Sequence, residues 1–492
     1  MKFTERRSSF VESIAPRQES LAKRTKEAAA IVARMVAFGG FIVVGAKSAR
    51  ADTIPPPMEL QEIASELAMI HKVENTDLET TIFQQRRQKV AEHVERIFDT
   101  ASEQEKEAYT LREQRMQELH LTTVPEYART LERGVLLGTS LKPGSFATQH
   151  EDRLYEFVRM IDALPEETPL LFDSVVFVEV YQQWLRERGF EQTAARIHPE
   201  QQHVLLENDY GAWAQDVGEF VLNGNESVLL TNMFNRATKV SPEETPSTYT
   251  LEQAHVVIDG GDTTVTNRHV LVGSSTVDRT RDTLARMGQD SSDTSVKRVL
   301  EETFDKPVLL VHPSEAWSPT LFHIDQYITP IQDDTVLVAD YQYNDAARKH
   351  IIADAEAYVA DLRLKDTKNG RTPRTETMYE TIRNDMVKSG IKTARQNEWL
   401  IDDAKRILDE EGYKIVSVPI SQDRLVEGQS YLNGMLYAGT DGKTHFLMPS
   451  FDDSSETDTV RTIIESHGIV VTPIEDAFFI GGGNIHCATN VL

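Results

Sequence analysis

Short apolar runs typical of β-strands alternate with amphipathic helical segments from about residue 195 to the end of the chain. Strands and helices that follow one another in this way predict an α/β fold made of repeated units. The predicted strands are 218–221, 227–230, 255–258, 269–273, 308–311, 335–339, 414–418, 435–438, 445–448 and 469–472. The predicted helices are 278–287, 296–304, 397–411 and 455–466.

The chain has 492 residues, of which 40% are apolar and 26% charged, as in a soluble globular protein of two or three domains. Its formal net charge of −26 argues against nonspecific nucleic-acid binding, which needs basic patches. An acidic surface favours a cationic substrate only weakly, and a solvated, self-repelling surface is the simpler interpretation. A single cysteine excludes an intrachain disulfide and a metal site with several cysteines.

The first 51 residues have the composition of a targeting or anchoring segment. A basic start precedes residues 28–46, which are apolar apart from Arg34, and Ala49-Arg50-Ala51 follows them. This is the order of parts in a secretory signal peptide, which predicts a periplasmic or secreted protein. An uncleaved membrane tether is an alternative, because about 20 apolar residues can span a bilayer. A cytoplasmic location stays open as a further alternative.

Residues 58–190 predict a mainly helical extension before the main domain, which we place at 195–492. Apolar residues recur at helical spacing between 58 and 121, and Ser102 with Glu105 forms a capping box that predicts a helix start. Further along, we predict helices at 152–164 and 181–188 and strands at 170–172 and 175–180. A charged helical insertion at 343–396 interrupts the α/β units, either as a lid or as a solvated surface element.

Three stretches place unusual polar groups among apolar neighbours. The only cysteine, Cys487, follows the glycines Gly481–Gly483 close to the chain end. His323 and Asp325 lie two apart, so in a strand their side chains would project from the same face. Asp216 lies in the third stretch. A thiolate is a nucleophile, an imidazole moves protons, and paired carboxylates can clamp the planar guanidinium cation.

These stretches resemble the guanidine-modifying enzymes of the pentein superfamily, which include protein-arginine deiminases and agmatine deiminases. The resemblance covers about residue 195 to the end, and the shared motifs keep the same order. At Gln215 agmatine deiminases usually have arginine, and here the sequence is more similar to protein-arginine deiminases. The motifs are Trp213-Ala-Gln215-Asp216, Asp259-Gly-Gly261, His323-Ile-Asp325, Ser430-Tyr-Leu-Asn-Gly434 and Gly481-Gly-Gly-Asn-Ile-His-Cys487-Ala-Thr489.

The resemblance implies a five-bladed α/β propeller with the site at its axis and an added N-terminal helical segment. It implies that Asp216 and Asp325 bind the substrate guanidinium, beside Trp213 and Gln215, while Cys487 attacks and His323 transfers protons. No metal is needed for this chemistry, although calcium is compatible with it because some similar enzymes depend on calcium. His486 would face away from Cys487 if the segment were a strand, and we interpret it as structural.

The activity implied is deimination of arginine residues in protein or peptide to citrulline, with release of ammonia through a covalent thiouronium intermediate. Deimination of a small guanidine such as agmatine is the main alternative. An amidinotransferase would use the same nucleophile and admit an amine in place of water. An inactive pentein that serves as a binding module is the alternative outside enzymes. The oligomeric state is not indicated.

Overall fold

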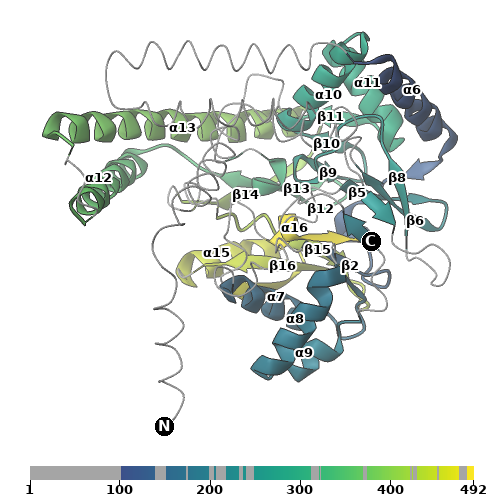
Figure 1. The fold of residues 1–492 in the computed structure, drawn as a ribbon, viewed down its shortest axis with the longest axis horizontal. Helices are drawn as coiled ribbons and strands as arrows, with labels where there is room; N and C mark the ends of the chain where they lie inside the picture. Colours follow the sequence, from purple (N-terminus) through teal and green to yellow (C-terminus); the bar gives the residue numbers. More distant parts are fainter. Residues whose placement is uncertain are drawn as a thin grey trace, which may run out of the picture. The chain divides into compact units, whose positions relative to one another are not determined.

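The computed structural model describes residues 101–138, 151–172, 175–198, 204–206, 218–231, 237–239, 249–311, 321, 323–368, 374–421, 424, 429–451, 454–475 and 485–492 (Figure 1). The chain divides into two units, Met1–Ser102 and Glu103–Leu492. The segment 1–51 and the helices expected between 58 and 100 lie outside the described residues, so those assignments stay predictions. In the part of the chain that is described, no helix combines the length and apolar character that crossing a membrane requires.

In the described residues, five small sheets share one arrangement, in which an inner strand has an antiparallel neighbour on one side and a parallel neighbour on the other. With the strands of each sheet given in spatial order, the first sheet contains β1 (Leu121–Thr122), β5 (Gly218–Asn223), β6 (Glu226–Thr231) and β8 (Thr250–Gln253), and the second contains β11 (Val308–Leu310), β10 (Val270–Val272) and β9 (Thr263–Val265). The third contains β12 (Ile328–Gln332), β13 (Thr335–Asp340) and β14 (Lys414–Pro419), and the fourth contains β15 (Met435–Ala438), β16 (Thr444–Ser450) and β17 (Val470–Glu475). The fifth contains β18 (Thr489–Val491), β2 (Val135–Leu137) and β3 (Leu170–Phe172). The strands β4 (Val204–Leu206) and β7 (Ala237–Lys239) form a separate pair.

Helices lie in the connections between most of the parallel neighbours, as a crossover between parallel strands requires. The helices concerned are α7 (Glu151–Ala163) between β2 and β3, α10 (Ser274–Met287) and α11 (Asp293–Phe304) between β10 and β11, α12 (Asp345–Lys368) and α13 (Glu376–Glu410) between β13 and β14, and α15 (Ser454–Glu465) between β16 and β17. Outside these connections lie α6 (Glu103–Glu118), α8 (Val175–Arg188) and α9 (Glu191–Ala195). The repeated α/β units expected from the sequence are therefore present.

One sheet joins the two ends of this unit. The last strand, β18, pairs antiparallel with β2 through Thr489↔Leu137 and Val491↔Val135, and β2 pairs in parallel with β3. Figure 1 shows β18 and the short helix before it lying among the sheets, beside β2. We expected a mainly helical extension up to residue 190, but its part from Glu103 onward lies in the same compact unit and contributes strands to its sheets.

Most predicted elements are confirmed, and two are wrong. The run 175–180, expected as a strand, is the start of α8, in which Val178, Tyr181 and Leu185 are buried at helical spacing. The intrinsic propensity of valine favours a strand, but burial of the helix face that carries Val178, Tyr181 and Leu185 stabilises a helix here. The run 255–258 is not a strand either, because β8 ends at Gln253.

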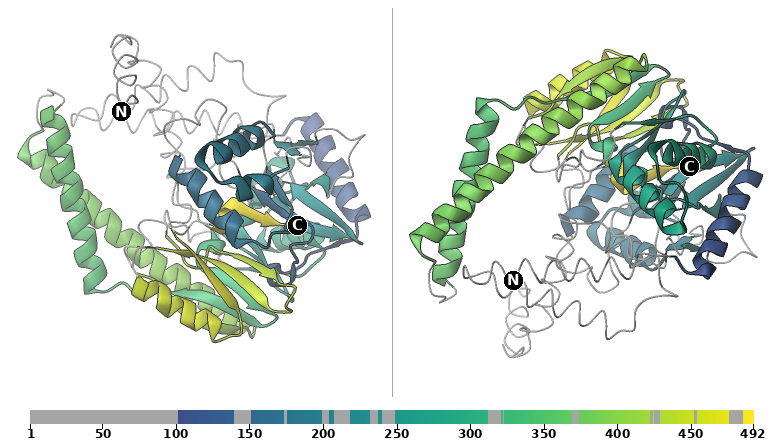
Figure 2. Two further views of the ribbon diagram at one scale, coloured as in Figure 1. Left: turned by 90° about the horizontal axis from the view of Figure 1, so that it is seen from below. Right: turned by 90° about the horizontal axis from the view of Figure 1, so that it is seen from above.

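The charged insertion expected at 343–396 is confirmed as helical. The helices α12 and α13 pack against one another, and the second continues into the helix expected at 397–411. Figure 2 shows this hairpin, drawn in green, extending away from the sheets. Its function as a lid stays a prediction.

Candidate active site

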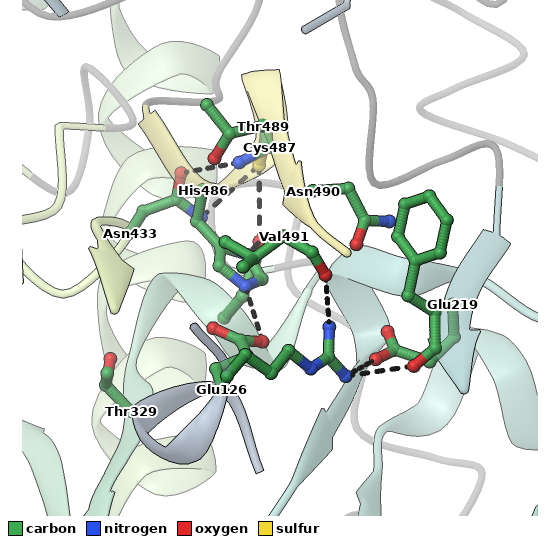
Figure 3. Close-up of polar contacts among 12 residues, drawn as sticks. Glu126, Glu219, Thr329, Asn433, His486, Cys487, Thr489, Asn490 and Val491 are labelled. Carbon is green, nitrogen blue, oxygen red and sulfur yellow. Dashed lines mark hydrogen bonds and ion pairs between the residues drawn. The ribbon is translucent and has the colours of Figure 1, made fainter. Parts of the chain in front are cut away.

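The thiol of Cys487 lies buried in α16 (Ile485–Ala488), the short helix directly before β18. Its Sγ atom accepts a hydrogen bond from Asn433 Nδ2 at 3.3 Å and donates one to Asp325 Oδ2 at 3.3 Å (Figure 3). The glycine run 481–483 lies outside the described residues. The pairing of β18 with β2 holds the end of the chain in place, so that a residue near the terminus reaches the interior.

His323 and Asp325 lie beside this thiol, although the segment that carries them is not a strand. His323 has extended backbone and precedes the 3-10 helix η5 (Ile324–Gln326), which contains Asp325. One ligand atom each of His323, Asp325 and Cys487 lies within 4.8 Å of the others, and all three residues are buried. The expected juxtaposition is therefore confirmed, but a helical turn produces it in place of a strand.

Asp259 is a further carboxylate at His323. It precedes the 3-10 helix η4 (Gly260–Asp262), and its Oδ1 lies 3.3 Å from His323 Nε2 while Arg279 lies 3.2 Å from its Oδ2. Burial alone would raise the pKa of Asp259, but the charges of His323 and Arg279 and the contacts with His323 and Ser275 together outweigh burial and hold this pKa below its usual range. Burial would likewise lower the pKa of His323, but the charge of Asp259, with the contacts to Asp259 and Cys487 and the charge of Asp325, raises it well above its ordinary value.

Gly261 packs directly against the imidazole of His323. A Cβ atom at this position would lie 2.3 Å from His323 Nδ1, which is closer than nonbonded atoms approach. Replacing Gly261 with alanine is therefore expected to displace the imidazole. With His323 in the proton-transfer role that the resemblance implies, the replacement should reduce kcat/KM by at least about tenfold, since small misplacements of catalytic groups have effects of this order. Steady-state kinetics beside a thermal unfolding curve checks this, and unchanged kcat/KM in a folded variant would contradict it.

Asn433 holds the segment that carries the thiol. Its side-chain oxygen faces the backbone N–H of Cys487 at 3.4 Å, and its backbone oxygen accepts the N–H of His486 at 3.0 Å. Because its Nδ2 also contacts Sγ, this one fully buried residue fixes both the backbone and the sulfur of Cys487. The sequence indicated Asn433 only as part of the motif 430–434, without a contact to the thiol.

The two carboxylate oxygens of Asp325 differ in their hydrogen bonding. Its Oδ2 contacts both Cys487 Sγ and His486 Nδ1, the latter at 2.9 Å. Its Oδ1 is buried and has no hydrogen-bond partner among the described residues. A buried acceptor without a partner is costly, so this oxygen suits a donor that arrives with a ligand. Trp213, Gln215 and Asp216 lie outside the described residues, and the pairing of Asp216 with Asp325 stays a prediction.

His486 bridges two carboxylates. Its segment is the short helix α16 and not a strand, so the condition under which His486 would face away from Cys487 is not met. Its Nδ1 lies 2.9 Å from Asp325 Oδ2, and its Nε2 lies 2.9 Å from Oε1 of Glu126, a residue of the 3-10 helix η1 (Glu126–Ala128) that the sequence did not indicate (Figure 3). Burial alone would lower the pKa of His486, but the charge of Glu126 and the contacts with Asp325 raise it to about 10.

Behind Glu126 lies a buried ion pair between Arg129 and Glu219. The Arg129 guanidinium also donates to the carbonyl of Val491 at 3.1 Å and to that of Phe220 at 3.2 Å. This cation therefore connects β5 to the terminal strand that follows Cys487. Figure 3 shows Glu126, His486 and Cys487 in one continuous polar region with Glu219 at its far end.

A small cavity adjoins this region. It has a volume of about 10 Å³, close to the space that a single water molecule needs, and Glu126, Asp325 and His486 are among its lining residues. His323, Asp325 and Cys487 are near enough to one another to share a metal ion. Calcium prefers several oxygen ligands, so this set with one sulfur and one nitrogen does not fit calcium.

Comparison with known proteins identifies the class. The sequence model of the Porphyromonas-type peptidyl-arginine deiminases matches residues 147–492. The chain is accordingly a hydrolase of carbon–nitrogen bonds in amidines. It belongs to the Porphyromonas-type peptidyl-arginine deiminase family, which confirms the resemblance to the pentein superfamily found in the sequence.

Solved structures of similar proteins give weaker likenesses. Agmatine deiminase of C. jejuni has 10% identity and a TM-score of 0.46, covering 76% of this chain and 96% of that one. A Porphyromonas gingivalis protein solved under the name arginine deiminase has 16% identity and a TM-score of 0.46, covering 75% of this chain and 97% of that one. A comparison with curated proteins finds no match. The family assignment therefore rests on the sequence model.

Proposed function

We propose that the chain deiminates arginine residues of proteins or peptides to citrulline and releases ammonia, with Cys487 as the nucleophile. The observation that carries the proposal is the buried gathering of a thiol, an imidazole and a carboxylate within 4.8 Å, in a member of a peptidyl-arginine deiminase family. The free Oδ1 of Asp325 supplies an acceptor for the guanidinium beside the sulfur.

In the first half of the reaction, Asp325 and Asp216 hold the substrate guanidinium so that its carbon lies over Sγ. The charge of protonated His323 and of the guanidinium stabilises the thiolate of Cys487. The thiolate attacks the guanidinium carbon and forms a carbon–sulfur bond. His323 gives a proton to the terminal nitrogen, the carbon–nitrogen bond breaks, ammonia leaves, and a thiouronium bound to Cys487 remains.

In the second half, water replaces ammonia. His323, now neutral, takes a proton from water, and the oxygen attacks the thiouronium carbon. The carbon–sulfur bond breaks and the sulfur leaves as thiolate. The remaining hydroxyl proton of the adduct passes to solvent, and the product carries a neutral ureido group. Asp259 serves this cycle by holding His323 at 3.3 Å and by favouring its protonated form at the start.

We propose that the five similar sheets are the blades of a propeller around this site. The support is their common strand arrangement and the position of Asp259, Asp325, Asn433 and Cys487 at or beside segments from four of them. The sheet of β18, β2 and β3 would close the ring by joining both ends of the unit.

The substrate is tested with the purified full chain incubated separately with an arginyl peptide, agmatine and free arginine, each with and without calcium. Measurement of ureido product is expected to give the highest kcat/KM for the peptide. Turnover of agmatine alone would replace the proposed substrate by the small guanidine, and transfer to an added amine would indicate an amidinotransferase. No product from any of the three, in either condition, would refute the catalytic assignment and favour a binding module.

We also propose that the first 51 residues direct export or tether the protein to a membrane. N-terminal sequencing of the protein from its native source distinguishes the two. A mature chain that begins near Asp52 supports cleavage, an intact terminus in the membrane fraction supports a tether, and an intact terminus in the cytoplasm contradicts both.

The pH dependence of the reaction is expected to move when Asp259 becomes asparagine. The pKa of His323 is raised by the charge of Asp259, and the starting state needs His323 protonated, so activity falls as pH rises through this pKa. Removing the charge of Asp259 lowers the pKa of His323. The alkaline limb of the kcat/KM profile then moves to lower pH, by one pH unit for each unit by which this pKa falls. The same substitution at exposed Asp361 on α12 is the control. An unmoved alkaline limb in Asp259→Asn would contradict the pairing.

A further inference from the structure

We propose that His486 is a positioning residue, clamped by Glu126, that fixes Asp325 for guanidinium binding beside the thiolate. The proposal rests on the function proposed above and assigns a role to a histidine and a glutamate that the reaction cycle leaves unused. Its starting point is geometric: two carboxylate oxygens lie 2.9 Å from the two ring nitrogens of one buried imidazole.

This geometry determines the protonation of the ring. Ionised carboxylates only accept hydrogen bonds, so both ring nitrogens must donate, and an imidazole that donates at both nitrogens is the imidazolium cation. The pKa of His486, raised to about 10, agrees with this. Burial would raise the pKa of Glu126, but the charge and hydrogen bond of His486, together with the charge of Arg129, lower it. The pair is therefore a fixed, buried charge arrangement across the neutral range.

The cation acts on one atom of Asp325. His486 Nδ1 and Cys487 Sγ both contact Oδ2, which leaves Oδ1 as the oxygen available to a substrate. A hydrogen bond to a carboxylate fixes the orientation of its plane, and so the direction in which Oδ1 points. The same cation offsets the repulsion that arises between Asp325 and the sulfur when the thiol ionises 3.3 Å away.

The charged groups that face His486 come from several elements. Glu126 lies on η1, Asp325 on η5, Glu219 on β5 and Cys487 beside it on α16, while Arg129 lies beyond Glu126 and pairs with Glu219. Among these, Glu126 and Asp325 are the hydrogen-bond partners of the ring. Removing the charge of Glu126 therefore changes the titration of His486 without removing its contact to Asp325.

Two substitutions of His486 separate its contacts. Asparagine places an amide donor near the position of Nδ1, so it can reach Asp325 but not Glu126, whereas leucine offers no donor. Hydrogen bonds to charged groups contribute about 1.5–3 kcal/mol, which corresponds to roughly 10- to 100-fold in affinity. We expect His486→Leu to raise KM for the guanidinium substrate by this factor and His486→Asn to recover most of the loss. Equal KM in the wild type and the leucine variant would overturn the proposal.

The pH profile supplies a readout that a merely structural role would not change. In Glu126→Gln the pKa of His486 falls, so the imidazolium beside Asp325 loses its proton at a lower pH than in the wild type. The loss of kcat/KM relative to the wild type should therefore grow as pH rises. The matched control is Glu132→Gln, which removes an exposed carboxylate from the same segment of chain. A loss in Glu126→Gln that is the same at every pH would contradict the proposal.

A test independent of turnover uses the single cysteine. The full chain is alkylated with chloroacetamidine, which carries an amidinium cation, and with the neutral chloroacetamide, and modification is followed by mass at Cys487, the one cysteine present. We expect the ratio of the two rates to fall at least about tenfold in His486→Leu and to stay within about threefold of the wild type in His486→Asn. A ratio unchanged in the leucine variant overturns the positioning role even if the wild type is active. A ratio that falls in a protein with no deiminase activity supports the positioning role while refuting the proposed function.

Discussion

Replacement of Cys487 by serine is expected to abolish ureido formation, with kcat reduced at least about 10³-fold. Serine keeps the size and a donor toward Asp325 Oδ2, but its hydroxyl has a pKa far above that of a thiol and does not ionise beside a carboxylate. Because no other cysteine exists in the chain, no second thiol can substitute. The measurement is single-turnover formation of ureido product from an arginyl peptide.

The serine variant is expected to keep its fold and its affinity for substrate. Asn433 can still donate to the oxygen and accept from the backbone N–H, so the segment stays in place. Equilibrium binding of the peptide within about threefold of the wild type, together with lost turnover, would separate chemistry from binding. Turnover above a tenth of the wild-type rate would contradict the nucleophile assignment.

Replacement of Arg129 by methionine is expected to cause the largest loss of stability. The change leaves the carboxylate of Glu219, which is 2% exposed, without its cation, and removal of one partner of a buried pair costs about 3–5 kcal/mol. It also removes donors to the carbonyls of Val491 and Phe220. We expect a clear fall in Tm by calorimetry and weaker attachment of the terminal strand.

The pH dependence identifies the cause of this loss. Burial already raises the pKa of Glu219 despite the opposing charge of Arg129, so without Arg129 this pKa rises further. A folded-state pKa above the unfolded value means that stability increases as pH falls, because protonation removes the buried charge. The difference in Tm between Arg129→Met and the wild type should therefore become smaller as pH falls toward 5.

Two further variants control the interpretation. Arg129→Met combined with Glu219→Leu removes both charges and should recover much of the stability, because a buried pair can be replaced by apolar residues. Arg406→Met breaks an exposed ion pair with Glu410 on α13 and should change Tm little. An Arg129→Met deficit that is independent of pH and unrecovered in the double variant would contradict the account.

The sequence predicted the local elements of the fold well because their signals lie in neighbouring residues. Helices such as 455–466 have the period of a helix that buries one face, and strands such as 435–438 are short apolar runs that are buried along their length. The run 175–180 was wrongly predicted as a strand because its valines have strand propensity. In the structure, contacts of α8 with β3 and α7 stabilise a helix. The sheet that joins β18 to β2 and β3 could not be predicted, because its partners lie at opposite ends of the unit and neither end carries a signal for the other.

For the site, the sequence indicated residues whose side chains have distinctive chemistry. It missed residues whose role depends on where the fold places them. Cys487, His323 and Asp325 stand out as a lone thiol and an imidazole–carboxylate pair, and the structure brings them together. Glu126 is one of many glutamates, and its contact with His486 spans 360 positions. Asn433 and Asp259 lay within recognised motifs, but only the fold shows that one contacts the sulfur and the other the imidazole.

The most direct test of the central claim is to trap the covalent intermediate. The full chain with its native sequence is mixed with an arginyl peptide, quenched in acid at a series of times within a single turnover and digested for mass spectrometry. Because ammonia leaves before water attacks, the account predicts that the peptide containing Cys487 transiently carries the substrate as a thiouronium adduct, and that Cys487→Ser shows none. Conversion of the arginyl peptide to citrulline with no adduct on Cys487 at any quench time, or an adduct on another residue, would contradict it.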